Sequence, residues 1–136
     1  SFEQTIRKSI QEKQKLVNQI ETLGLQNRVI LYGFAKNVYP IFKKAKLCVV
    51  SSRIEGFPNV LLQMMSQNNA IVSTLCAGEI ANIKGIFTCE NNDVASLKDA
   101  MEKGLNNNKN NQLIFKDYLK SRSIDKFVNS ILKKIN

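Results

Sequence analysis

Residues 51–65 read Ser-Ser-Arg-Ile-Glu-Gly-Phe-Pro-Asn-Val-Leu-Leu-Gln-Met-Met, and they decide the fold. The apolar run Ala45–Ser52 (AKLCVVSS) that leads into them predicts a buried strand, and Asn59–Gln67 predicts a helix. Gly56 and Pro58 interrupt the chain between that strand and that helix. In an open α/β sheet, ligands bind beyond the carboxyl end of a strand, at such a loop.

The same alternation of strand and helix continues on both sides of this stretch. Apolar runs predict further strands over residues 28–33, 70–74 and 85–89. Helices are predicted over residues 1–23, 38–44, 93–105 and 112–135, with a polar turn at 106–111. Because the strand runs lack alternating polar residues, the strands should be parallel and covered on both faces. We therefore expect an α/β fold with a doubly wound, mostly parallel, Rossmann-like sheet and helices on both faces.

Local signals also mark the ends of these elements. Gly24 is expected to end the first helix, and Asn92 or Asp93 to cap the helix over 93–105. The chain opens on a helix, whereas a doubly wound domain normally opens on a strand that carries its first ligand-binding turn. We therefore expect a sheet that is truncated at its start.

Length and composition fit one globular domain. The chain has 136 residues, 43% of them hydrophobic, which favours a single domain over residues 1–136. No apolar run approaches the about 20 residues of a membrane-spanning helix and no export signal is recognised, so we expect a cytoplasmic protein.

Histidine, the commonest general base and metal ligand, is absent. Cys48, Cys76 and Cys89 form no Cys-x-x-Cys pair, so we interpret them as buried apolar residues in a reducing compartment.

The chain carries a formal net charge of +9. A positive balance favours anionic partners such as nucleotides, nucleic acid or lipid headgroups. It can equally be incidental to a composition that is rich in Lys and Asn. A basic cluster without acidic neighbours is either a solvated face or a contact with anionic lipid, and its members are Lys36, Lys43, Lys44, Lys46 and Arg53.

The loop and the start of the following helix offer the groups that a sugar diphosphate needs. Gly56 lets the backbone approach a ligand, and the first helical amides, at Asn59 and Val60, point unpaired toward the loop, where they favour a phosphate. Glu55 can accept hydrogen bonds from hydroxyl groups but would repel a second anion. A sugar attached to a diphosphate satisfies both demands. Asn59 can also act as the helix N-cap, and Gln63 shares its face of the helix.

At these residues the chain resembles the family-4 glycosyltransferases of the GT-B fold. Their nucleotide-sugar-binding half carries a loop of the type Ser-x-x-Glu-Gly-Phe-Pro-Asn-x-x-Leu-Glu-Ala-Met. The resemblance extends from about Asn27 to Leu105 and includes the strand ending in Gly-Phe at 28–34 and the strand at 70–74. The family signature is a Glu, seven residues and a second Glu, and here Glu55 and Gln63 occupy the two positions.

This resemblance implies that the chain is the carboxyl-terminal, donor-binding half of a retaining glycosyltransferase whose amino-terminal acceptor domain is absent. Glu55 would be the catalytic residue and would bind hydroxyls of the donor sugar. Gln63 would face the ribose, with one acceptor where a carboxylate has two. Glu79 is interpreted as structural or as a surface residue. The donor-binding residues would be Gly33 and Phe34 near the base, together with Gly56, Phe57, Pro58, Asn59, Val60 and Gln63.

The resemblance further implies hexosyl transfer from a UDP-sugar to a hydroxyl acceptor, in the synthesis of bacterial surface polysaccharide or lipopolysaccharide. No metal or other cofactor is expected, since helix amides and basic side chains would stabilise the leaving diphosphate. The expected partners are UDP or a UDP-sugar, the missing amino-terminal domain, and a lipid-linked or saccharide acceptor. Peripheral attachment to the inner face of the cell membrane stays open, and the chain alone should be inactive.

Two alternatives remain at this point. One is a sugar-nucleotide epimerase or a phosphorylase of the GT-B fold, which the Glu-Gly-Phe-Pro-Asn loop disfavours because that loop is typical of the transferases. The other is a nucleic-acid-binding module built on the basic surface. The chain lacks a recognition motif or interleaved aromatic residues for that role, so no nucleic-acid partner is expected.

Overall fold

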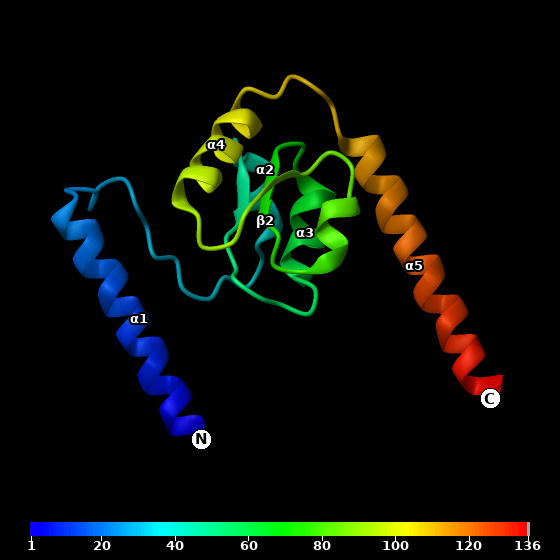
Figure 1. The fold of residues 1–136 in the computed structure, drawn as a ribbon, viewed down its shortest axis with the longest axis horizontal. Helices are drawn as coiled ribbons and strands as arrows, with labels where there is room; N and C mark the ends of the chain where they lie inside the picture. The colour runs from blue at the N-terminus through cyan, green and yellow to red at the C-terminus, as the bar shows by residue number, and fades with distance from the viewer. Residues whose placement is uncertain (136) are drawn as a thin grey trace. The chain divides into compact units, whose positions relative to one another are not determined.

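The computed structural model describes residues 1–135, and Asn136, the last residue of the predicted domain, lies outside the described residues. The chain forms two compact units, the first over Ser1–Lys36 and the second from Asn37 onward (Figure 1). The first unit holds helix α1 (Phe2–Thr22), and the second holds the sheet and the other helices.

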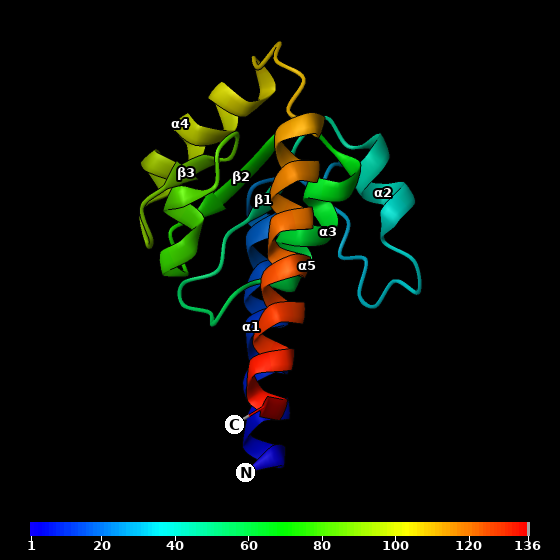
Figure 2. The ribbon, with the colours of Figure 1, turned by 90° about the vertical axis from the view of Figure 1, so that its right-hand side faces the viewer.

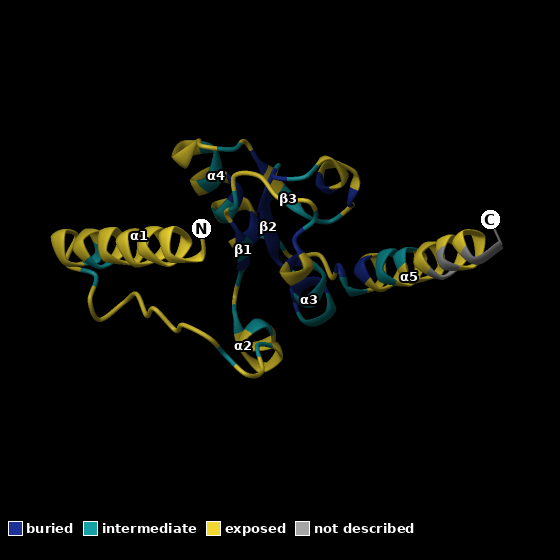
Figure 3. Ribbon diagram, turned by 90° about the horizontal axis from the view of Figure 1, so that it is seen from below, coloured by how far each residue is buried: buried dark blue, intermediate teal, exposed yellow. Residues whose placement is uncertain are grey.

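Helix α1 lies within one residue of its predicted bounds at each end. The Ser1 side chain accepts a hydrogen bond from the Gln4 amide at 3.3 Å, and the Ser1 amino group donates to Gln4 Oε1 at 3.1 Å, which completes a capping box. Leu23 is the C-cap, and Gly24 follows with φ of +65°, a left-handed conformation that glycine adopts without strain. Every residue of α1 is exposed or half-buried (Figure 3).

The prediction of a strand over residues 28–33 is wrong. These residues are irregular and exposed, with Ile30 at 77% and Tyr32 at 68% of their maximal accessible surface. A strand exists only where its backbone groups pair with a neighbouring strand, and the first unit contains none among its described residues. An apolar run is therefore insufficient here to form a strand.

The sheet of the second unit is parallel, as predicted. Its strands are β1 (Cys48–Val50), β2 (Ile71–Thr74) and β3 (Phe87–Cys89), in the spatial order β1-β2-β3. Val49 pairs with Val72, and Val72 pairs with Phe87, so the carboxyl ends of the strands lie along one edge.

The helices of this unit also lie close to their predicted positions. They are α2 (Tyr39–Lys44), α3 (Asn59–Gln67), α4 (Val94–Leu105) and α5 (Gln112–Ile135). Asp93 caps α4, because its Oδ1 accepts from the Ser96 amide at 2.9 Å. A short 3-10 helix, η1 (Gly78–Asn82), was not predicted. None of the helices within residues 1–135 combines the length and hydropathy that crossing a membrane requires.

Alternating side chains of the strands enter two separate cores. On one face, residues of β1 and β2 pack with Leu61 and Met65 of α3 and with Phe115 of α5. On the other face, Val72 and Cys89 pack with Ala100 of α4. Figure 2 shows α4 on one side of the sheet and α3 with α5 on the other, which confirms a doubly wound fold with helices on both faces. The three cysteines are free and buried, as predicted.

Asn68 joins three segments of this unit from the end of α3. Its Nδ2 donates to the carbonyl oxygens of Phe42 and Ala45, both at 2.7 Å, and its Oδ1 accepts from the Ala70 amide at 2.8 Å. The side chain is buried, so these backbone groups have little access to water. Asn68 thereby fixes the end of α2 against the start of β2.

Candidate functional site

The segment between β1 and α3 forms a loop at the carboxyl end of the sheet. Thr74, the last residue of β2, donates a hydrogen bond from its hydroxyl to the Ser52 carbonyl oxygen. The Glu55 amide donates to the Cys76 carbonyl oxygen at 2.9 Å. The loop after β1 is therefore tied to the end of β2 and to the residues that follow it.

Glu55 lies on the exposed side of this loop. The Ser52 hydroxyl donates to Glu55 Oε1 at 2.5 Å, which leaves the second carboxylate oxygen available to a ligand. At Gly56 an added Cβ would meet nothing within 4 Å. The space beside the backbone of residues 55–56 is thus open on the surface of this unit.

The start of α3 lies directly beyond Glu55. Pro58 is the N-cap, with an extended backbone, and no side chain caps the helix. Asn59 is the first helical residue, as predicted, and the alternative that Asn59 is the N-cap does not hold, because Pro58 occupies that position. The amides of Asn59 and Val60 have no carbonyl partner in the preceding turn, and both residues are exposed. This helix end offers two backbone donors and the positive end of the helix dipole.

A cavity of about 440 Å³ opens beside the loop at the same edge of the sheet. It is lined from the ends of all three strands by Ser51, Arg53, Thr74, Glu90, Asn92 and Asp93, among others. Glu90 and Asp93 bring acidic groups to it, and Arg53 is exposed nearby. This cavity was not predicted from the sequence, because its lining depends on the register of three strands.

The comparisons with known proteins agree with this arrangement. Residues 7–107 match the family model of glycosyl transferases group 1. The chain belongs to this glycosyltransferase family. An uncharacterized glycosyltransferase of Methanocaldococcus jannaschii is 41% identical over 64 residues, which are 47% of the chain and 16% of that protein. The N-acetylgalactosamine-N,N'-diacetylbacillosaminyl-diphospho-undecaprenol 4-alpha-N-acetylgalactosaminyltransferase of Campylobacter jejuni is 36% identical over 62 residues, 46% of the chain and 17% of that protein.

A solved structure supports the fold independently. Sucrose-phosphate synthase from Thermosynechococcus elongatus matches with a TM-score of 0.73 at 15% identity, over 91% of the chain and 34% of the solved chain. This likeness identifies the fold as that of a GT-B glycosyltransferase domain. The chain matches about one sixth of the length of each curated relative.

The residues that are expected to bind the donor differ in burial, and two of them belong to the first unit. Phe57 is half-buried and Pro58 is fully buried, so their side chains face the core rather than the open side of the loop. Gln63, one turn beyond Asn59, is half-buried. Gly33 and Phe34 belong to the first unit, where the Phe34 ring is 94% exposed. Their expected role near the base stays a prediction, as do the roles of the other donor-binding residues.

The members of the predicted basic cluster that lie in the second unit are exposed. Lys43 and Lys44 end α2, and Lys46 and Arg53 flank β1. None of the four forms a salt bridge among the described residues.

No group of three or more His, Cys, Asp or Glu side chains within residues 1–135 could hold a metal ion. That transfer needs no metal stays a prediction.

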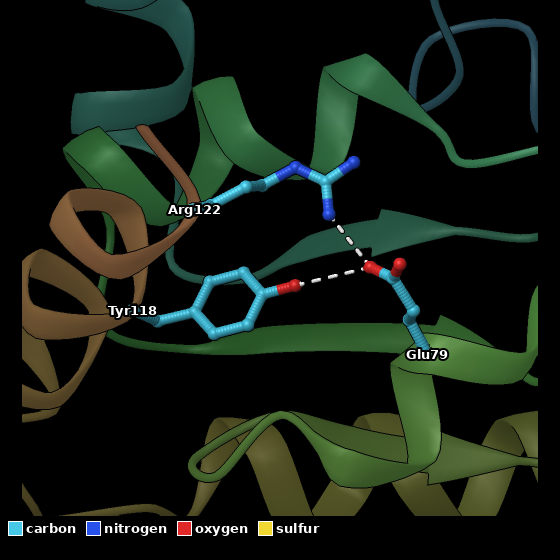
Figure 4. Close-up of polar contacts among 3 residues, drawn as sticks. All are labelled: Glu79, Tyr118 and Arg122. Carbon is cyan, nitrogen blue, oxygen red and sulfur yellow. Dashed lines mark hydrogen bonds and ion pairs between the residues drawn. The ribbon is translucent and has the colours of Figure 1, made fainter. Parts of the chain in front are cut away.

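A polar cluster that was not predicted from the sequence lies next to the loop. Arg122 of α5 donates from a terminal guanidinium nitrogen to Glu79 Oε2 at 2.6 Å, and the Tyr118 hydroxyl donates to the same oxygen at 3.5 Å (Figure 4). Burial alone would lower the pKa of Arg122, but its interactions with Glu79 and Tyr118 raise it overall. The guanidinium carbon also lies 4.0 Å from the centre of the Phe57 ring. No local signal in the sequence links these residues, which are distant in the chain.

Proposed function

We propose that this glycosyltransferase domain binds a nucleoside-diphosphate sugar, with UDP as the nucleotide, and takes part in transfer of the sugar to a hydroxyl acceptor with retention. The observation that carries the proposal is the uncapped start of α3 next to the exposed carboxylate of Glu55. The amides of Asn59 and Val60 suit a diphosphate, because a helix N-terminus favours an anion. Glu55 suits the hydroxyls of the attached sugar.

The transfer breaks the bond between the anomeric carbon and the diphosphate oxygen and forms a bond to the acceptor oxygen, whose proton is released. Negative charge then develops on the leaving diphosphate. The dipole of α3 contributes about 0.3 to 1 kcal/mol to its stabilisation, in addition to the hydrogen bonds of the amides. The carboxylate of Glu55 holds the neutral sugar, and its charge disfavours a second anion at that position.

The remaining residues extend this site. Gln63 presents its amide toward the ribose, where it accepts one hydrogen bond and donates another. Phe57 contributes through its backbone amide, whereas Pro58 has no amide hydrogen and fixes the turn. That Gly33 and Phe34 contact the base stays a prediction, and the acceptor site is assigned to the expected amino-terminal domain.

We also propose the type of sugar that is transferred and the class of its acceptor. The Campylobacter relative bears the name of a transferase that acts on a diphospho-undecaprenol-linked saccharide. We extend this acceptor class to the present chain: hexosyl transfer to a lipid-linked or saccharide acceptor in bacterial surface polysaccharide or lipopolysaccharide synthesis. The exposed basic residues 43, 44, 46 and 53 support contact with anionic headgroups at the inner face of the cell membrane.

Calorimetric titration of the chain with UDP tests the nucleotide part of the proposal. We expect saturable and weak binding, and weaker binding of NAD. Single-stranded DNA, titrated at two salt concentrations, is the comparison for the nucleic-acid alternative. Steeply salt-dependent DNA binding without UDP binding, or a preference for NAD, would contradict the proposal.

The ribose contact is tested by comparing UDP with 2′-deoxy-UDP. In Gln63→Ala the ratio of the two affinities should fall toward one, because the variant lacks the amide that contacts the hydroxyls. Gln67→Ala, one turn further along α3, is the matched control and should keep the ratio of the unmodified chain. An unchanged ratio in Gln63→Ala would remove Gln63 from the site.

A further inference from the structure

The ring of Phe57, in the loop between β1 and α3, is covered by the guanidinium of Arg122 on α5. The Arg122 guanidinium stacks over the Phe57 ring at 4.0 Å from carbon to ring centre. Phe57 lies between Gly56, where an added Cβ would meet nothing within 4 Å, and Pro58, which is buried in the core. The Phe57 ring is therefore the point at which α5 can fix the exposed part of the loop.

The same guanidinium also reaches the chain that follows β2. It bonds to Glu79 of η1 at 2.6 Å, and Tyr118, one turn earlier on α5, donates to the same carboxylate oxygen (Figure 4). Three residues before Glu79, the Cys76 carbonyl oxygen accepts the hydrogen bond from the Glu55 amide. Arg122 thus joins the loop after β1, through Phe57, to η1, through Glu79.

The environment of Arg122 is not that of an ordinary surface ion pair. Its side chain retains only 22% of its maximal exposure, and its Nε is buried without a hydrogen-bond partner among the described residues. An arginine that only paired with Glu79 would keep its Nε in water at no cost. The unpaired Nε indicates that packing against Phe57 determines where the guanidinium lies.

We propose that Arg122 is a positioning residue for the donor loop. Through Phe57 and Glu79 it holds the turn at residues 56–58, and with it the Glu55 backbone and the first amides of α3, in the arrangement that receives the diphosphate sugar. The planar guanidinium is required, because only arginine combines stacking on a ring with a directed bond to a carboxylate. This inference rests on the function proposed above for the same loop.

Four variants of the whole chain test this role. Arg122→Met keeps the apolar stem, Arg122→Lys keeps the charge, and Phe57→Leu keeps apolar packing without a ring. The matched control is Lys126→Met, because Lys126 is exposed on the same helix one turn beyond Arg122. We expect Arg122→Met, Arg122→Lys and Phe57→Leu each to lower UDP affinity by about 5- to 50-fold, and Lys126→Met to leave it unchanged.

A double-mutant cycle separates positioning from general stability. The variant with both Arg122→Met and Phe57→Leu should bind UDP about as weakly as either single variant, because the two side chains act as one unit. Additive losses, full rescue by Arg122→Lys, or unchanged affinity in Arg122→Met would overturn the proposal.

Hydrogen exchange of the Glu55 amide gives a readout that needs no ligand. We expect its exchange to accelerate by about fivefold or more in Arg122→Met but not in Lys126→Met, with thermal unfolding recorded in parallel. If the unmodified chain binds no UDP while Arg122→Met still accelerates this exchange, the proposed nucleotide fails and the positioning of the loop stands. Unchanged exchange in Arg122→Met would overturn the positioning itself.

Discussion

Replacing Asn68 by alanine removes three hydrogen bonds from the interior of the second unit. The carbonyl oxygens of Phe42 and Ala45 lose their donor at 2.7 Å, and the Ala70 amide loses its acceptor at 2.8 Å. Each lost bond of this kind costs about 1 kcal/mol, and a buried group left unpaired costs about 1 to 3 kcal/mol. We expect Asn68→Ala to lower the free energy of unfolding by about 3 kcal/mol, a large share of the about 5 to 15 kcal/mol of a typical domain.

Urea unfolding followed by far-ultraviolet circular dichroism measures this loss. The adjacent Asn69→Ala is the matched control, because Asn69 Oδ1 is buried without a partner among the described residues and its removal should cost less than about 0.5 kcal/mol. A loss below about 1 kcal/mol in Asn68→Ala would refute the assignment of Asn68 as the link between α2 and β2.

Asn68→Asp adds a test with a defined pH dependence. The introduced carboxylate would keep the acceptor for the Ala70 amide but place its second oxygen against the carbonyl oxygens of Phe42 and Ala45. Its pKa in the folded state should therefore rise above the ordinary value of about 3.9. With a raised folded pKa, its contribution to stability is present below about pH 4 and is lost as pH rises through the folded pKa. At pH 7 we expect Asn68→Asp to be less stable than Asn68→Ala, with the order reversed in acid.

Three further predictions address the core, a thiol and the ribose contact. Phe115→Ala removes a fully buried ring and should cost about 3 to 5 kcal/mol in urea unfolding, and a loss near zero would show that α5 is not anchored there. Burial raises the pKa of Cys48, so its alkylation by iodoacetamide at pH 8, followed by mass spectrometry, should be at least about tenfold slower in the folded than in the urea-unfolded chain. Since this folded pKa is raised, the contribution of the Cys48 thiol to stability should also decline only above about pH 8.5. Gln63→Glu should raise UDP affinity by about 1 kcal/mol or less and alter the ratio of UDP to 2′-deoxy-UDP binding, and calorimetry showing no change in either would contradict the ribose contact.

The strands and helices that could be predicted from the sequence are those with local causes. The run at 45–52 and the glycine-proline loop after it locate β1 and α3, and Gly24 and Asp93 act at helix ends through their own backbone or side chain. The run at 28–33 misled the prediction because strand formation depends on pairing with a distant segment, which composition does not reveal. The helix start at Asn59 was predicted correctly, whereas the alternative cap role of Asn59 rested on residue preference alone and is excluded by the turn that Pro58 imposes.

From the sequence, residues could be assigned to the candidate site only where they lie close together along the chain. Glu55, Gly56 and Asn59 could be proposed together because they share one loop and one helix start. Arg122 is one of 20 basic residues, and nothing nearby in the sequence distinguishes it from the solvated ones. Its contact with Phe57 arises from the packing of α5 beside α3, so only the fold brings it to the site.

The most direct test of the account compares UDP with UDP-sugars in the unmodified chain and in Glu55→Ala. Because Glu55 is assigned to the sugar hydroxyls and the amides of α3 to the diphosphate, the two ligands should respond differently. Calorimetry with UDP, UDP-glucose and UDP-N-acetylgalactosamine should show one UDP-sugar binding more tightly than UDP to the unmodified chain and to the control Glu102→Ala, whose exposed carboxylate lies on α4. In Glu55→Ala that advantage should vanish while UDP affinity stays within about twofold. An undiminished preference for the sugar in Glu55→Ala, or no binding of any of the three ligands to the unmodified chain, would contradict the account.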